Sequence, residues 1–581
     1  MNKFKIILSL LLLITVSACN DEFLERYPLS ELSPQTFFRN EKDLRLYLNS
    51  MYSMVPSATG IYNEDVDNII KTSLSSELTG NRTVPTSGGG WSWGDLRKIN
   101  YFLENYDKTL KAEEVKPYAA EARFFRAWFY FKKVKRFGDV PWYGKVIESD
   151  DLENLTKARD PRTLVMDSVL ADIDFAVEHL ADVRNSEKVN KWTALALKSR
   201  LCLFEGTFRK YHTEFNLPDA DKFLEESAKA AEELINNGPY SLYTSEPEKA
   251  YLELFAATDA VESEVILARK YSAELQLYHN LNYYTITASY GRPGLEKSLV
   301  NSYLMKDGSR FTDIPEYDKM QFYEEVQNRD PRLAQTVRTP GYTRIGNNVT
   351  EVPDFGASVT GYQLIKFVTE PSNDSNNRSH NDMPVFRLGE MMLNFAEAKA
   401  ELGTLTQSDL DISINQLRAR VGMPALQLAE ANANPDAYMS EQYQQVTGAN
   451  QGVILEIRRE RRIELVMEMF RWDDLMRWKE GHLLTRQYKG MYFPGPGQYD
   501  LDQNGTVDLV IYEGEKPTVP GAQLLKLGSE IDLENASGGG LILINPHISK
   551  SFNESRDYLF PIPYQELQLN GNLTQNPGWP E

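Results

Sequence analysis

The strongest constraint on the fold is a helical pattern of apolar side chains between residues 113 and 137. Phe124, Ala127, Phe131 and Val134 follow one another at spacings of three and four residues. This spacing places the four side chains on one face of an α-helix, which Gly138 is expected to end. Such a helix must bury its apolar face, so the pattern predicts a core built from packed helices.

The same pattern recurs along much of the chain. It predicts further helices at about residues 161–180, 191–208, 219–236, 386–402, 407–421, 453–469 and 471–480. Consecutive pairs of such helices predict a mainly α fold, a tetratricopeptide-like α-solenoid scaffold, although no strict 34-residue repeat is visible. Long irregular loop inserts interrupt the pairs, and alternating stretches such as residues 507–512 predict a few small β-hairpins.

The N-terminus predicts a lipoprotein signal peptide over residues 1–18. Lys3 and Lys5 precede an apolar run, residues 6–16, which is far shorter than the ~20 residues of a membrane-spanning helix. The segment Val16-Ser17-Ala18-Cys19 resembles a bacterial lipobox, whose cysteine is acylated. We therefore expect Cys19 to carry a lipid anchor at the head of a tether over residues 19–28. The alternative is an ordinary signal peptide with a chance cysteine.

The rest of the chain divides into three parts by composition. Residues 29–240 form a helical region, residues 241–384 form an insert rich in Tyr, Asn, Gly and Pro, and residues 385–581 combine helix pairs with a Gly/Pro-rich tail. Inserts this long are usually functional, disordered or modular. The insert is therefore a natural place to look for ligand-binding side chains.

Charge and catalytic motifs narrow the function. The net charge of −20 argues against nucleic acid, which requires a basic surface. The sequence contains no Gly-x-Ser-x-Gly, His-Glu-x-x-His, Walker or dinucleotide-binding motif, so we expect no enzyme of those classes and no required cofactor. A surface glycoside hydrolase stays open as an alternative, because its paired carboxylates are set by distance in space.

One segment has the pattern of a calcium loop. Side-chain oxygens of Asp500, Asp502, Asn504 and Asp508 stand at positions one, three, five and nine, with a glycine at six and the Thr506 carbonyl at seven. The twelfth position is an isoleucine where a bidentate glutamate is expected. A structural calcium ion and a hairpin turn at the Asn-Gly pair are both open interpretations, and they are compatible.

Two groups of aromatic residues lie in polar loops and are candidates for ligand binding. Trp91 and Trp93 follow three glycines, and Tyr283, Tyr284 and Tyr290 lie in the insert. Rings presented on loops can stack on the apolar faces of sugars. Trp93 has an alternative role as a core anchor, because it directly precedes a predicted helix.

Six motifs occur in an order that resembles the SusD/RagB family of outer-membrane nutrient-uptake lipoproteins. They are AEARFFRAW with FGDVP (120–128 and 137–141), RDPRL (329–333), NFAEAK (394–399), ERRIEL (460–465), RWDDLMRW (471–478) and FPIP with TQNPGW (560–563 and 574–579). The resemblance spans nearly the whole chain. Considered without the resemblance, the four-residue spacings of Glu460 and Glu464 and of Arg458 and Arg462 favour ion pairs along one helix. These residues are therefore expected to support the scaffold.

This resemblance implies a function and a location. It implies a non-enzymatic lipoprotein of the cell outer membrane that captures oligosaccharides and passes them to a SusC-like TonB-dependent barrel. The acidic Asn20-Asp21-Glu22 resembles an export tag for the exterior face. A RagB-like peptide-binding lipoprotein is the nearest alternative, and the resemblance places aromatic ligand platforms in both loop regions named above.

Overall fold

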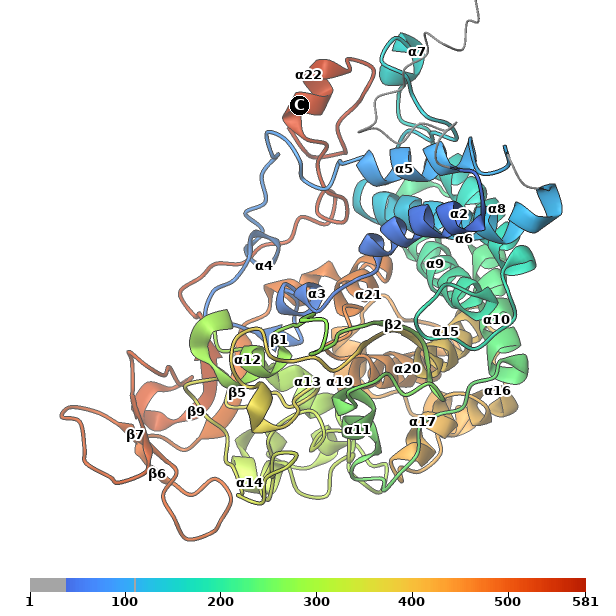
Figure 1. Ribbon diagram of the computed structural model, residues 1–581. Coiled ribbons are helices and arrows are strands. Elements are labelled where there is room, and N and C mark those ends of the chain that lie inside the picture. The colour runs from blue at the N-terminus through green and yellow to red at the C-terminus, as the bar shows by residue number, and fades with distance from the viewer. Residues whose placement is uncertain (1–37, 109–110, 581) are drawn as a thin grey trace, which may run out of the picture.

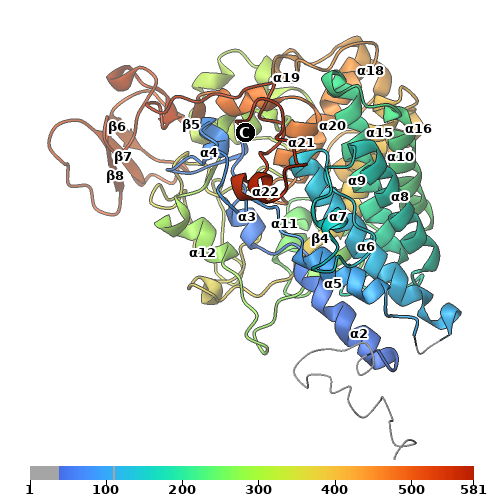
Figure 2. The same cartoon turned by 90° about the horizontal axis from the view of Figure 1, so that it is seen from above.

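The computed structural model describes residues 38–108 and 111–580 and confirms a mainly helical scaffold. The predicted signal peptide, Cys19 and the tether lie outside these residues. Long helices pack side by side in chain order, α6 against α8, α8 against α9 and α9 against α10, and α10 then packs against α15 and α15 against α20 (Figures 1 and 2). Their bounds are α6 Ala112–Phe137, α8 Arg162–His179, α9 Lys191–Tyr211, α10 Ala220–Asn237, α15 Leu388–Glu401 and α20 Gln451–Glu464.

Local signals set the ends of these helices. The Asn190 side chain accepts a hydrogen bond from the Thr193 amide at 3.1 Å and caps α9. α6 ends at Gly138, whose φ of +71° a residue with a side chain rarely adopts. A Cβ at this glycine would also lie 3.1 Å from the Leu559 side chain, so the C-terminal segment can close over the end of α6.

Shorter helices cover the ends and sides of the scaffold. In the N-terminal region they are α2 Glu41–Asn49, α3 Thr59–Tyr62, α4 Ser76–Thr79, α5 Gly94–Leu103 and α7 Leu152–Leu155. In the insert they are α11 Ala250–Ala256, α12 Leu281–Ile286, α13 Lys297–Ser302 and α14 Phe322–Glu325. Towards the C-terminus they are α16 Gln407–Asp411, α17 Ile414–Arg420, α18 Leu428–Ala433, α19 Ala437–Gln442, α21 Arg471–Arg477 and α22 Tyr564–Leu569.

The strands form small separate sheets, as predicted. β1 (Ile69–Ile70) pairs antiparallel with β3 (Gly294–Leu295), β2 (Val265–Arg269) with β4 (Met383–Arg387), and β5 (Tyr488–Phe493) with β9 (Gly540–Ile544). β6 (Gly497–Tyr499) and β7 (Leu509–Tyr512) make a hairpin, to which β8 (Gln523–Lys526) adds in parallel. This last sheet projects from the body at the lower left of Figure 1. The β2–β4 pair joins the two ends of the insert to the scaffold.

Two predicted helix boundaries were wrong. The segment 407–421 forms two short helices, α16 and α17, and the segment 453–469 is helical only to Glu464. Met467 and Met469 adopt positive φ values of 61° and 65°, which end the helix in a turn. The apolar pattern continued through that turn because Leu465, Val466 and Met467 are buried as well.

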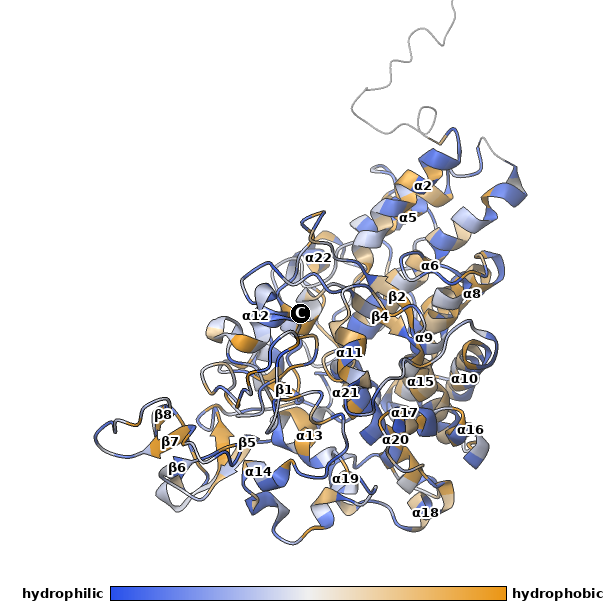
Figure 3. Cartoon of the chain, turned by 60° about the horizontal axis from the view of Figure 1, so that its bottom comes forward, coloured by the Kyte–Doolittle hydropathy of each residue, from blue (hydrophilic) through white to orange (hydrophobic). Residues whose placement is uncertain are grey.

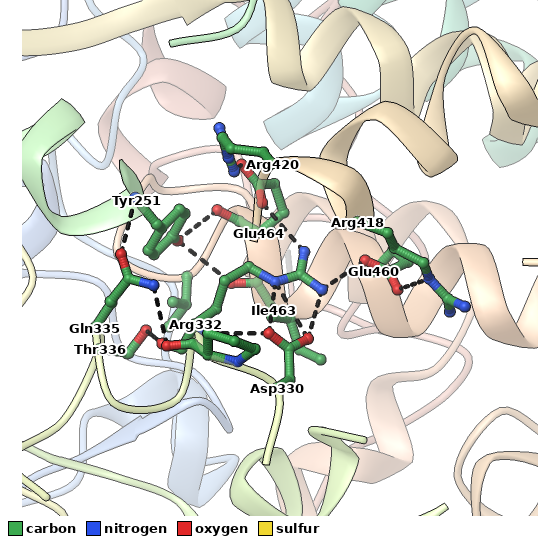
Figure 4. A network of polar contacts seen from close by, with 12 residues as sticks. Tyr251, Asp330, Arg332, Gln335, Thr336, Arg418, Arg420, Glu460, Ile463 and Glu464 are labelled. Atoms are coloured by element: carbon green, nitrogen blue, oxygen red, sulfur yellow. Dashed lines mark hydrogen bonds and ion pairs between the residues drawn. The ribbon is translucent and has the colours of Figure 1, made fainter. Parts of the chain in front are cut away.

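The Glu/Arg cluster has its predicted scaffold role but different partners. α17 and α20 are largely blue in Figure 3, although nearly all of their charged side chains are buried. Instead of pairing along α20, Glu460 and Glu464 accept from Arg332, and Glu464 also accepts from Arg420 of α17 at 2.6 Å (Figure 4). The ion pairs therefore join separate segments, because a buried charge needs a partner from whichever element faces it.

None of the helices in the described part of the chain is both long and apolar enough to cross a membrane.

Candidate ligand-binding site

A cluster of tyrosine rings forms where α12 and the short helix Ala288–Tyr290 turn back towards α3. Gly291 ends that helix with a φ of +82°, and its carbonyl accepts from the Thr72 amide at 2.8 Å. The Tyr290 ring lies 5.0 Å from the Tyr62 ring and 6.2 Å from the Tyr283 ring, measured between centroids. The structure thus joins the insert to a loop of the N-terminal region.

The three predicted tyrosines have different exposures. Tyr283 and Tyr290 are half-buried and can present a ring face or a hydroxyl to a ligand. Tyr284 is fully buried beneath them, 5.5 Å from the Tyr290 ring, so its predicted contact with ligand is wrong. The Tyr284 ring points inward because neighbouring residues of a helix point in different directions, so that one side of α12 faces solvent and the other faces the core.

A cavity of about 560 Å³ opens beside this cluster. Tyr62 and Asn280 belong to both, and the Asn280 side-chain amide donates to the Tyr290 hydroxyl at 3.1 Å. The remaining wall consists mainly of aromatic, amide and hydroxyl side chains, with charged groups at the edge. It includes Tyr52, Tyr271, Tyr278, His279, Glu187, Lys270 and Asn377. A wall of this kind suits a ligand that carries both apolar faces and hydroxyl groups.

His279 contributes to this wall as a neutral group. Burial lowers the pKa of His279 to about 4, even though its Nε2 lies 2.9 Å from the Asn381 carbonyl oxygen. At neutral pH the ring is therefore uncharged and packs against Tyr271 with centroids 4.5 Å apart.

The two tryptophans lie elsewhere and pack in the core. Trp91 is 5% exposed, and its ring meets Phe137 at 4.9 Å and Trp93 at 5.4 Å. Trp93 also packs against Phe129 and Tyr130 of α6. The glycine loop before Trp91 folds onto α6 and turns most of the ring inward, but Trp91 also belongs to the wall of a second cavity, so its contact with ligand stays a prediction. Trp93 has the core-anchor role that was its alternative.

Trp91 and Trp93 both line a second, apolar cavity of about 650 Å³. This cavity lies between α5, α7 and α22, with the leucines Leu152, Leu155 and Leu569 exposed at its mouth. Figures 1 and 2 show α5 well apart from α12. The two predicted aromatic groups therefore do not form one site.

The predicted calcium loop connects β6 and β7 and gathers three carboxylates. Oxygen atoms of Asp500, Asp502 and Asp508 all lie within 4.8 Å of one another. Burial raises the pKa of Asp508, and the charges of Asp502 and Asp500 raise it further, so the carboxylates repel one another. Hydrogen bonds to the Asp500 carboxylate from the amides of Asn504 and Gly505, at 3.1 and 2.7 Å, close the loop without a tight two-residue turn.

Sequence reasoning missed most of the cavity wall. Tyr62 and Tyr271 come from segments more than 200 residues apart, and Asn280 and His279 carry no motif. A local signal existed for Tyr271 and Tyr278, which belong to the same tyrosine-rich stretch as Tyr283. The contribution of the N-terminal loop had no local signal.

The fold and the cavity define a helical-repeat protein whose insert helps to line a cavity. The family model described as the SusD family matches residues 263–579, and a model described as starch-binding and associating with the outer membrane matches residues 22–203. The chain belongs to the SusD family.

Relatives and solved structures agree with this assignment. The chain is 24% identical to SusD-like protein P2 of Formosa agariphila, over the full length of both. A SusD-like carbohydrate-binding protein of Bacteroides fragilis superimposes with a TM-score of 0.68 at 23% identity, covering 93% of this chain and all of that one. A laminarin-binding SusD-like protein superimposes with a TM-score of 0.53 at 17% identity, covering 93% and 100%.

Proposed function

We propose that this protein is a lipid-anchored lipoprotein on the outer face of the outer membrane, which captures oligosaccharides and passes them to a SusC-like TonB-dependent barrel. The observation that carries the proposal is the tyrosine-lined cavity with its neutral amide and hydroxyl groups. Membership of the SusD family and the likeness of the fold to a laminarin-binding SusD-like protein support a glycan as the ligand.

Binding without cleavage is part of the proposal. A glycosidase of the usual kind requires two carboxyl groups flanking the scissile bond. In the part of the chain that the structure describes, Glu187 is the one carboxylate that lines the cavity, and it lies 3.6 Å from Lys270. A single carboxylate already paired with a cation favours capture over hydrolysis.

We also propose that the loop from Asp500 to Asp508 binds calcium as a structural ion. The carboxylates of Asp500, Asp502 and Asp508 are close enough to share one cation. Calcium prefers hard oxygen ligands, and the Asn504 side chain, the Thr506 carbonyl and water would complete the set that these carboxylates begin. The ion would also relieve the repulsion between the carboxylates. The twelfth loop position, Ile511, pairs with Gly497 in the β6–β7 hairpin and supplies no carboxylate.

The ligand is tested by titration calorimetry of the full chain, purified in detergent, against neutral oligosaccharides and peptides. Tyr290→Ala is expected to weaken glycan binding about tenfold, because it removes an exposed stacking face. Tyr118→Ala is the matched control, since Tyr118 is a partly exposed tyrosine on α6, and its binding curve is expected to match the wild type.

Other outcomes decide between the alternatives. If the protein binds peptides and no measurable binding is found for any glycan, peptide capture would replace the glycan proposal. Shortened products after prolonged incubation would establish a hydrolase. The anchor and the partner are tested separately, by loss of incorporated palmitate in Cys19→Ala and by co-purification of the barrel with the wild-type chain.

A further inference from the structure

A third, smaller pocket of about 200 Å³ carries an excess of arginine. It lies between α4, the C-terminal end of α6 and the C-terminal segment, and its lining includes Ser76, Asn81, Arg82, Arg136 and Phe560. The whole chain has a net charge of −20, so a pocket whose lining contains two arginines differs in charge from the protein as a whole. We call it the Arg82–Arg136 pocket.

Arg82 is buried but incompletely paired. Its residue is 7% exposed, and its Nη2 donates to the Asp557 carbonyl at 2.6 Å and lies 3.0 Å from the Asp557 carboxylate. Its Nε and Nη1 atoms are buried and have no hydrogen-bond partner. The guanidinium carbon lies 4.7, 5.6 and 5.9 Å from the ring centres of Phe560, Trp579 and Trp472, so these atoms face aromatic rings. Arg82 therefore contributes a fixed positive charge in the wall of the pocket rather than free donors for a ligand.

Arg136 adds a second guanidinium to the same pocket. Its Nε donates to the Gly89 carbonyl at 2.8 Å, and its guanidinium carbon lies 3.7 Å from the centre of the Phe560 ring. Arg82 lies over the same ring at 4.7 Å. Among the described residues no carboxylate forms an ion pair with Arg136 within 4.0 Å, whereas Asp557 pairs with Arg82 and Arg556.

Nearby charges leave the pocket positive. Burial lowers the pKa of both Arg82 and Arg136, which shows that desolvation outweighs the carboxylates around them. Among the described residues that line the pocket Glu77 is the acidic one, and its carboxylate accepts from the Ser76 hydroxyl at 3.0 Å. An anion entering the pocket would therefore meet the Arg136 guanidinium, held against Phe560, with the buried Arg82 charge behind it.

The pocket is close to the tyrosine cluster. The Thr72 amide donates to Gly291, the residue after Tyr290, and Ser76 lines the Arg82–Arg136 pocket. The four residues from Thr72 to Ser76 span at most ~14 Å of chain. Figures 1 and 2 show α4 and α12 on the same side of the molecule. One oligosaccharide is long enough to reach both.

We propose that the Arg82–Arg136 pocket binds the carboxylate or sulfate group of an acidic oligosaccharide whose sugar rings contact the tyrosine cluster. This inference rests on the proposed glycan-binding function and names its substrate class. Guanidinium groups bind such anions through paired, charge-assisted hydrogen bonds, which a neutral sugar cannot form. The pocket thus selects for charge, whereas the tyrosines bind sugar faces of any kind.

The test compares neutral, uronate and sulfated oligosaccharides of equal length by titration calorimetry of the full chain in detergent. The wild type is expected to bind at least one acidic class about tenfold more tightly than the neutral one, with the advantage shrinking as salt rises. Arg136→Gln is expected to reduce the ratio of acidic to neutral affinity to about one, and Arg136→Lys to retain most of it. Lys229→Gln, an equal charge change at a side chain 64% exposed on α10, is expected to keep the wild-type ratio.

Each outcome has a separate meaning. Preference for the uronate alone or the sulfate alone would identify the anionic group. Equal binding of neutral and acidic glycans by the wild type would overturn this inference and leave the proposed function intact. The absence of measurable binding to every glycan would overturn both this inference and the proposed function. Unfolding of Arg136→Gln would show in its melting curve, and the decision would then rest on the wild-type ratio and on Arg136→Lys.

Discussion

Arg332 Nη2 lies 2.9 Å from Glu460 Oε2, although 128 residues separate the two along the chain. The same guanidinium also contacts Asp330 and Glu464 at 2.6 and 3.2 Å, and all four side chains are buried. Arg332 therefore ties the insert to α20. Glu460 and Glu464 also pair with other arginines, whereas Arg332 is the one cation paired with Asp330 among the described residues.

Removal of this guanidinium is expected to be strongly destabilising. Arg332→Met leaves the buried Asp330 carboxylate without its cation and removes one partner each from Glu460 and Glu464, so we expect a loss of about 3–5 kcal/mol in the free energy of unfolding. Urea denaturation followed by circular dichroism measures the change. Lys249→Met, at a surface pair with Glu246, is the control and is expected to change stability by less than about 1 kcal/mol. Similar midpoints for both variants would refute a structural role for the network.

Trp91→Ala is expected to affect stability through lost packing. The substitution removes a ring buried against Phe137 and Trp93, which costs about 3–5 kcal/mol for a large core aromatic. Tyr283→Ala, at a half-buried ring, is expected to cost much less. Thermal melts of the two variants compare them directly, and an unchanged melting temperature for Trp91→Ala would show that the ring is not a core anchor.

Stability is expected to fall in acid because of Glu397. Burial alone would raise the pKa of Glu397, but the charges of Arg477 and Arg461 overcome it and hold the pKa at about 2. A carboxyl group with a lowered folded-state pKa stabilises the fold above its unfolded pKa of ~4.3 and loses that contribution as pH falls towards 2. The contribution at neutral pH is on the order of 3 kcal/mol.

Melting temperatures of Glu397→Gln and the wild type between pH 7 and pH 3 test this dependence. The variant is expected to be less stable at pH 7 and to lose less stability on acidification. Glu178→Gln, at a side chain 75% exposed, is expected to follow the wild-type curve. Parallel curves for Glu397→Gln and the wild type would mean that this carboxyl group does not carry the acid sensitivity.

Calcium is expected to stabilise the protein if the loop from Asp500 to Asp508 binds it. At a calcium concentration one hundred times the dissociation constant, the gain is about 2.7 kcal/mol for a site absent from the unfolded chain. Calorimetric melts in calcium and in a chelator measure the shift, which Asp502→Asn is expected to reduce. Magnesium at equal concentration controls for charge screening, and identical melts in all solutions would exclude the site.

Much of the scaffold could be predicted from the sequence. Helices α6, α8, α9, α10 and α15 were located to within a few residues, because their apolar spacing and end signals are local properties of the chain. The short helix α7 was not predicted. The turn after Glu464 was missed because it is as buried as the helix before it. The partners of Glu460 and Glu464 were missed because spacing along one helix says nothing about which arginines face it.

The binding site shows the same division. The sequence by itself determined that tyrosines gather near residues 283–290 and that carboxylates gather at residues 500–508, because each group is contiguous in the chain. Only the tertiary structure decided that Tyr284 is buried, that Trp91 packs against α6, and that Tyr62 and Tyr271 share a cavity. The physical reason is that exposure and contact depend on how distant segments pack, and short-range spacing does not encode that packing.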